Sequence, residues 1–252
     1  MKQRKAIFGR GSAIAIAASL SLVVGFLTPT ADAQAVTGAD FNPGNIMSDA
    51  VMFNGNALAA SDIQAFLNAK VPRCTLGDPG KPAGGIYTFP SGYQTLLANN
   101  CLKDYSENVS SIGGDAICAP LTGGTLTAAQ IIYSVGISCG VSQKVLLVLL
   151  EKEQLLISDT FPAQRQYDHA TGFNCPDTAP CSAASAGFFR QLYSAARQLQ
   201  VYGTGSLTWY PVGAVSNILW NVATTECGSS PVLIQNRATA ALYYYTPYQP
   251  NA

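Results

Sequence analysis

The pattern of hydrophobic and polar positions predicts several helices in the second half of the chain. The clearest covers residues 144–157, KVLLVLLEKEQLLI, whose leucines fall on one arc of a helical wheel at about 100° per residue. Its two acids lie on different sides of that wheel, with Glu153 inside the apolar arc and Glu151 beside Lys144 on the polar side. We therefore expect Glu151 to be an ordinary solvated residue and Glu153 to point where apolar side chains pack.

Capping signals predict two shorter helices earlier in the chain. Ser61 with Gln64, and Thr127 with Gln130, each form the pattern of a capping box before an apolar run. Gly140 stands where the second of these helices should end, because glycine readily takes a positive φ. Helices are therefore expected near residues 61–70 and 127–139.

Two later segments, 185–203 and 236–248, also have helical spacing, and Pro247 should end the second. The apolar face of the first consists of Phe188, Leu192, Ala195, Ala196 and Leu199. Strand signals are weaker, with PVLIQ and SLTWYPV as the candidates, and residues 71–124 carry prolines, glycines and three cysteines that favour loops. These patterns predict a mainly α fold, with α+β as the alternative.

The first 33 residues have the composition of a secretory signal peptide. Four basic residues precede the apolar run AIAIAASLSLVVGFL, and the small-residue pattern ADA at 31–33 predicts cleavage before Gln34. The alternative is an uncleaved membrane anchor, for which the run is short. We expect an exported protein that is free of the membrane after cleavage.

The remaining chain divides into two stretches that we expect to pack as one domain. Residues 34–124 should form a loop-rich segment with one short helix, and residues 125–252 a helical region. Beyond position 33 the chain keeps ten of its 14 basic and thirteen of its 14 acidic residues, which leaves a formal charge of about −3. This balance does not suit a nucleic-acid binder. We expect a monomer.

All seven cysteines follow the predicted cleavage site, which in an exported chain favours disulfides. Pairing of neighbours gives Cys74–Cys101, Cys118–Cys139 and Cys175–Cys181, and leaves Cys227 over. Connectivity does not follow from sequence alone, so other pairings stay open. With a single histidine, His169, and no CxxC motif, we expect no metal site.

Few kinds of catalysis fit this sequence. A Ser-His-Asp or Cys-His arrangement would have to use His169, and no GxSxG motif, phosphate-binding loop or dinucleotide fingerprint is present, so we expect no cofactor. Carboxylate chemistry remains, because an apolar environment favours the protonated form that a glycosidase uses as its acid. The alternative for Glu153 is a structural ion pair with Arg190 or Arg197.

Several segments resemble a family of secreted actinobacterial lysozyme-like proteins within the lysozyme superfamily, near goose-type lysozymes and soluble lytic transglycosylases. These segments cover most of residues 40–252 and read DFNPGNIMSDAVMFN, SDIQAFLNAKVPRC, AAQIIYSVGISCGVSQKVLLVLLEKEQLLISDTFP, ATGFNCPDTAPC and ATAALYYYTPYQPNA. The resemblance implies a lysozyme-like helical domain with long disulfide-stapled loops. The Gly-Leu-Met-Gln stretch of the better-known transglycosylases is missing after residue 157.

The resemblance also implies a catalytic site. It makes Glu153 the general acid, with Gln154 beside it, and makes ATGFNCPD the opposite wall of a cleft, contributing Thr171, Gly172 and Asp177. The alternative for this loop is a turn tied by Cys175 and Cys181.

A hydrolase would need a second acid, for which Asp159, Asp168 and Asp177 are candidates. A lytic transglycosylase would need only Glu153, because the 6-hydroxyl of the sugar itself attacks the anomeric carbon. Aromatic side chains suit a sugar-binding cleft, and further candidates for substrate contact are Tyr167, Asp168 and Tyr244. Trp209, Tyr210 and the rest of the run Tyr243-Tyr244-Tyr245 are also available.

The sequence thus leaves two candidate functions. The first is a secreted enzyme, a muramidase or lytic transglycosylase, that cleaves peptidoglycan through Glu153. The second is a non-catalytic surface module that binds glycan or another protein.

Overall fold

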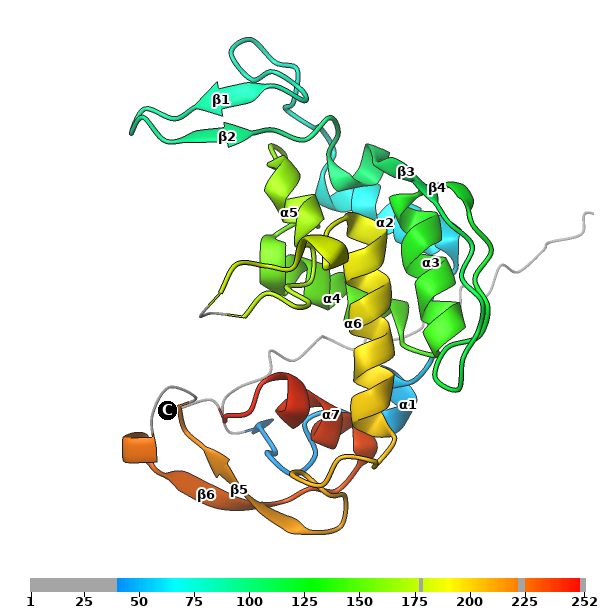
Figure 1. Ribbon diagram of the computed structural model, residues 1–252, viewed down its shortest axis with the longest axis vertical. Helices are drawn as coiled ribbons and strands as arrows, with labels where there is room; N and C mark the ends of the chain where they lie inside the picture. The colour runs from blue at the N-terminus through cyan, green and yellow to red at the C-terminus, as the bar shows by residue number, and fades with distance from the viewer. Residues whose placement is uncertain (1–39, 177–178, 222–224, 250–252) are drawn as a thin grey trace, which may run out of the picture. The chain divides into compact units, whose positions relative to one another are not determined.

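Seven α-helices and six β-strands form the part of the chain that the computed structural model describes, residues 40–176, 179–221 and 225–249 (Figure 1). The helices are α1 (Asp49–Met52), α2 (Ala60–Lys70), α3 (Ala128–Cys139), α4 (Gln143–Gln154), α5 (Gln164–Asp168), α6 (Phe188–Gly203) and α7 (Arg237–Tyr245). The strands are β1 (Ile86–Thr88), β2 (Gln94–Leu96), β3 (Ser106–Val109), β4 (Gly124–Thr127), β5 (Val215–Leu219) and β6 (Ser229–Leu233). The predicted signal peptide and its cleavage site lie outside the described residues.

The strands pair into three separate antiparallel sheets of two strands each, β1–β2, β3–β4 and β5–β6. The predicted mainly α fold, a lysozyme-like helical domain, is therefore wrong, and the described chain is α+β. Residues 71–124, expected to be loops, hold β1, β2 and β3. The candidate PVLIQ overlaps β6, whereas the other strand of that sheet begins at Val215, after SLTWYPV.

Sequence signals at the helix ends explain where α3 begins and ends. Thr127 accepts a hydrogen bond from the backbone N–H of Gln130, and the side chain of Gln130 accepts one from the N–H of Thr127, as the capping box predicted. Gly140 takes the left-handed conformation at φ +65° and ends α3. For α2, however, the first cap is Ala59, whose N–H is bound by Asp62, so Ser61 lies inside the helix.

One large apolar core joins the helices. Helix α3 packs against α2, α4 and α6, and α6 also packs against α7 at its other side (Figure 1). The predicted apolar face of α6 is confirmed, because all five of its residues are buried. A second cluster, which includes Ile218, Val232 and Tyr243, lies between β5–β6 and α7.

The three predicted disulfides are confirmed. Cys74 is bonded to Cys101, Cys118 to Cys139 and Cys175 to Cys181, and within the described residues Cys227 is free and exposed. Three disulfides in one chain are typical of proteins from oxidising, extracellular compartments. No helix among the described residues has the length and apolar character needed to cross a membrane.

Candidate functional site

Glu153 lies in the last turn of α4, at the point where the helix stops. Its side chain is 24% exposed, so the apolar arc of the helical wheel correctly placed it in a part-buried position. The helix ends after Gln154 because Leu155 takes the left-handed conformation at φ 57°. The N–H of Leu155 bonds to the carbonyl of Glu151 over 2.9 Å, which is the hydrogen bond of an αL C-cap. The predicted continuation of the helix to residue 157 is wrong.

Two side chains hold one oxygen of the Glu153 carboxylate. The Tyr245 hydroxyl donates a hydrogen bond to Oε1 over 2.5 Å, and Lys152 Nζ lies 2.8 Å from the same oxygen. The Lys152 ammonium also lies 5.1 Å from the centre of the Tyr245 ring. Burial, followed by the hydrogen bond to Glu153, raises the pKa of Tyr245. Tyr245 therefore stays a protonated donor at neutral pH.

The other oxygen, Oε2, faces the backbone of Gly172. A Cβ atom at position 172 would lie 3.4 Å from Oε2, and Gly172 has φ +66°, a conformation that favours glycine. Among the described residues, no hydrogen-bond partner contacts Oε2. The carboxylate therefore has one oriented oxygen and one oxygen available for chemistry.

The two arginines considered as partners of Glu153 contact other groups. Arg197 forms an ion pair with Asp115, and Arg190 donates to the backbone carbonyl of Ala184. The expected structural pair with one of these arginines is therefore wrong. The cation that contacts Glu153 is Lys152, whose own side chain is 56% exposed.

Glu151 is not the ordinary solvated residue that the helical wheel suggested. Its Oε2 accepts hydrogen bonds from the N–H groups of Ile157 and Ser158, each over 3.1 Å. Its Oε1 accepts the Ser158 hydroxyl over 2.6 Å. Glu151 thus satisfies the backbone of the turn after α4 and fixes the segment that follows Glu153.

The candidates for a second acid bind structural partners. Asp159 accepts hydrogen bonds from the Phe161 N–H and from the side chain of Gln166, over 2.7 and 2.9 Å. Asp168 accepts one from the side chain of Gln164 over 3.0 Å. Asp177 lies outside the described residues. Within the described part of the chain, neither of the other two aspartates hydrogen-bonds to Glu153.

The predicted substrate contacts Tyr167 and Thr171 belong to the protein interior. Tyr167 is fully buried, stacks on Tyr105 and donates its hydroxyl to the carbonyl of Asn100. Thr171 is also buried and bonds to Gln191. These two residues support the loop that carries Gly172 and do not reach the surface.

The remaining predicted residues have mixed positions. Gln154 is half-buried, and its carbonyl accepts the side chain of Gln166 over 2.6 Å. Tyr244 stacks against Tyr202, and its hydroxyl accepts the N–H of Tyr210. Trp209 is 79% exposed. The structure therefore brings Gln154 and Gly172 next to Glu153, whereas Tyr244 packs elsewhere.

Tyr245 and Lys152 both contact Glu153. Sequence reasoning named Tyr245 only as one member of a tyrosine run and missed Lys152. Tyr245 belongs to the run Tyr243-Tyr244-Tyr245, and nothing in that run distinguishes the tyrosine that faces α4. Lys152 precedes Glu153 directly, and neighbours in a helix point about 100° apart. A long lysine side chain can nevertheless bend back to the next residue, and this adjacency was the available signal.

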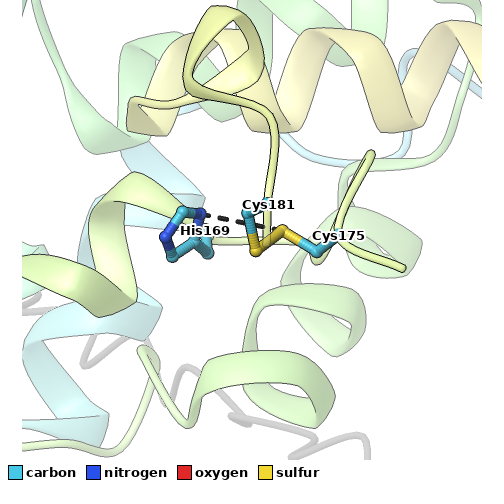
Figure 2. A group of neighbouring side chains, drawn as sticks. All are labelled: His169, Cys175 and Cys181. Atoms are coloured by element: carbon cyan, nitrogen blue, oxygen red, sulfur yellow. Dashed lines mark hydrogen bonds between the residues drawn. A yellow bond between two sulfur atoms is a disulfide. The ribbon is translucent and has the colours of Figure 1, made fainter. Parts of the chain in front are cut away.

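A second group of reactive side chains lies in the same loop as Gly172. Figure 2 shows the His169 ring beside the Cys175–Cys181 disulfide, with Nδ1 at 3.7 Å from the sulfur of Cys175. The ligand atoms of these three residues lie within 4.8 Å of one another, as a metal site would require. Because the two sulfurs are bonded to each other, neither is a thiolate that could bind a metal. The disulfide closes the loop that continues from Gly172.

Comparisons with protein-family models, with curated proteins and with solved structures find no match for this chain, so its candidate site is defined by geometry alone.

Proposed function

We propose that this protein cleaves the glycan strands of bacterial peptidoglycan, with Glu153 as the acid that protonates the glycosidic oxygen. The observation that carries the proposal is the asymmetry of the Glu153 carboxylate. Tyr245 orients Oε1, whereas Oε2 faces Gly172 without a partner among the described residues. The resemblance of the sequence to secreted lysozyme-like proteins supports the same assignment.

The reaction requires Oε2 to carry the proton at the start. Glu153 gives this proton to the bridging oxygen as the bond from that oxygen to the anomeric carbon breaks. In the transglycosylase route, the ionised carboxylate then takes the proton of the sugar's 6-hydroxyl while the oxygen of this hydroxyl bonds to the anomeric carbon. The product ends in an anhydro sugar, no water is consumed, and Glu153 regains its proton.

The positions of the aspartates favour this single-acid route over hydrolysis. Asp159 and Asp168 each accept a hydrogen bond from the side-chain amide of a glutamine, which leaves them less free to activate a water molecule. An attacking hydroxyl that belongs to the same sugar is already close to the anomeric carbon, so it needs less activation than a water molecule. Products with reducing ends would instead require a second acid, for which Asp177 is the remaining candidate.

Lys152 must leave Glu153 before the reaction starts. The ion pair holds the carboxylate against the lysine, whereas proton transfer requires the carboxylate to meet the glycosidic oxygen. The Lys152 side chain is more than half exposed, so a bound glycan can displace it at small cost. The same contact favours the second candidate function, a non-catalytic module that binds glycan or protein and keeps the Lys152–Glu153 ion pair.

The cellular setting follows from the same proposal. We infer that residues 1–33 act as a signal peptide and that the mature protein works as a monomer at the cell wall. The three disulfides are consistent with an extracellular location.

Mass analysis of the soluble products tests the proposed reaction. Purified peptidoglycan incubated with the exported protein should release muropeptides with anhydro ends, which are lighter by one water than hydrolysis products. Reducing-end products would replace the transglycosylase assignment by a hydrolase. Saturable binding to the same cell walls without any released fragment would support the binding module.

A further inference from the structure

A pocket of about 560 Å³ lies beside the Glu153 site, on the other side of Tyr245 and Lys152. Its volume is in the range of small-molecule sites, about 300–1,000 Å³. Its walls come from the segment before α2, from one face of α4 and from α7. They include Met47, Val51, Val145, Val148, Leu149 and Leu242. The lining is almost entirely apolar, so the pocket suits a hydrocarbon chain.

The charged side chains that line this pocket all have the same sign. They are Lys144 and Lys152, and the described residues of the lining include no aspartate or glutamate. Both lysines belong to α4, eight residues and therefore about 12 Å apart along the helix axis. Val148 lies between them and is 67% exposed. An apolar surface thus runs between two exposed ammonium groups.

A neighbouring pocket shows that this charge pattern is not general along α4. That pocket, of about 480 Å³, shares Lys144 and Val148 with the first but is also lined by Lys70, Asp62 and Glu151. Its charges have both signs, and it offers no preference for an anion or a cation. Of these two pockets, the first combines an apolar interior with lining charges of one sign, and Lys144 is the lysine that no carboxylate of the described residues pairs with.

We propose that the first pocket binds a single-chain anionic amphiphile, with its alkyl chain in the apolar interior and its acidic head group at the lysines. Burial of the chain releases water from apolar surface on both partners, which stabilises the complex. A polar ligand would instead lose its hydrogen bonds with water and find few new partners in this lining. The head group is a carboxylate or a phosphate, because both accept charge-assisted hydrogen bonds from an ammonium group.

This binding site goes beyond the proposed glycan cleavage and does not depend on it. Lys152 and Tyr245 contact both Glu153 and the pocket, so neither serves in the test. Lys144 and Val148 are exposed residues of the pocket that do not contact Glu153. Substitutions at these two positions should therefore affect binding of the amphiphile while the protein stays folded.

Calorimetric titration of the exported protein tests the proposal with four probes of equal chain length, each kept below its micelle-forming concentration. The probes are dodecanoate, dodecyl phosphate, dodecanol and dodecyltrimethylammonium. The two anions should bind at one site per protein. The alcohol and the cation should bind with affinities at least about tenfold lower. The tighter of the two anions then identifies the head group.

Matched variants locate the binding. Lys144→Glu should weaken both anions by about tenfold or more, whereas Arg190→Glu makes the same charge change on an exposed residue of α6 outside the pocket and should leave binding unchanged. Val148→Asp should weaken binding as well, and Val215→Asp, on an exposed residue of β5, should not.

Three results would overturn the proposal. These are no saturable binding of either anion, binding of dodecanol as tight as that of the anions, or wild-type affinity in both Lys144→Glu and Val148→Asp. Circular dichroism checks whether each variant is folded. If either Lys144→Glu or Val148→Asp does not fold, the affinity of the other variant decides.

Discussion

The hydroxyl of Tyr245 lies 2.5 Å from Oε1 of Glu153, although 92 positions separate the two residues in the sequence. Helix α7, whose first turn is capped by the side chain of Asn236, brings Tyr245 to this position as it packs against α6. The contact joins the last helix of the described chain to the acid at the end of α4. It leaves Oε2, without a hydrogen-bond partner among the described residues, as the oxygen that we propose transfers the proton.

Removal of the Tyr245 hydroxyl should disturb this orientation. Tyr245→Phe keeps the ring but loses a hydrogen bond to a carboxylate, so peptidoglycan cleavage should fall about tenfold or more. The matched control is Tyr244→Phe, which loses a hydroxyl that contacts the backbone N–H of Tyr210. Rates of muropeptide release by both variants check this prediction. Equal rates would mean that the Tyr245 hydroxyl does not contribute to cleavage.

The space in front of Oε2 can be tested at Gly172. Gly172→Ala adds a methyl group 3.4 Å from Oε2 and forces alanine to φ +66°, so both activity and stability should fall, the latter by about 1 kcal/mol. Gly205→Ala places alanine at φ +76° with no atom within 4 Å, and it should cost similar stability without loss of activity. Thermal unfolding and cleavage assays separate the two effects. Full activity of Gly172→Ala would mean that substrate does not approach Oε2 from this side.

Leu155 gives a prediction about stability alone. It ends α4 in a left-handed conformation that is unfavourable for a bulky side chain, and its side chain is exposed. Leu155→Gly should therefore raise the free energy of unfolding by about 0.5–1 kcal/mol, after the greater chain entropy of glycine is subtracted. Leu155→Ala keeps the unfavourable φ and should give no such gain. Urea unfolding of the two variants would measure the difference.

Asp115 should make stability depend on pH in acid solution. The N–H of Cys118, then that of Ile117 and then Arg197 lower the pKa of Asp115 from 3.8 to about 2. Because the pKa is lower in the folded protein, ionised Asp115 stabilises the fold at pH values above its ordinary pKa. This stabilisation disappears as the pH falls from about 4 to about 2. The difference in free energy of unfolding between wild type and Asp115→Asn should therefore become smaller as the pH is lowered over this interval. Urea unfolding at several pH values checks it, and a constant difference would contradict it.

Helices α3 and α6 were predictable because their signals are local. The capping box at Thr127 and the glycine at position 140 lie within the segment that they define, and both have the expected geometry. The apolar face of α6 follows from spacing alone, since residues three and four apart share a face. Such signals do not depend on how the rest of the chain folds.

Apart from β6, which overlaps the candidate PVLIQ, the strands were not predictable because their partners are distant and their patterns short. Ser106 pairs with Thr127, and the two strands of that sheet are joined by residues 110–123, which are tied into the fold by Cys118. Strands of three to five residues show too little alternation to be recognised.

The part-buried position of Glu153 was predictable, and the side chains that contact it were not. A helical wheel suffices to find an acid among leucines, but the tyrosine that meets it depends on how α7 packs against α6. The role of Glu151 was hidden for a different reason. Its partners, Ile157 and Ser158, reach it only because the helix stops after Gln154, and a leucine at position 155 gave no sign of that stop.

The central claim is that Glu153 is the acid of a peptidoglycan-cleaving reaction, and a comparison of Glu153→Gln with wild type tests it most directly. Glutamine keeps the shape of the side chain but cannot donate the proton, so muropeptide release should fall about a hundredfold to ten-thousandfold, the range for a general acid. Asp104→Asn, which neutralises an exposed aspartate paired with Lys103, should cleave at the wild-type rate. Both variants should melt close to the wild-type temperature. If Glu153→Gln releases muropeptides as fast as wild type, Glu153 is not the catalytic acid.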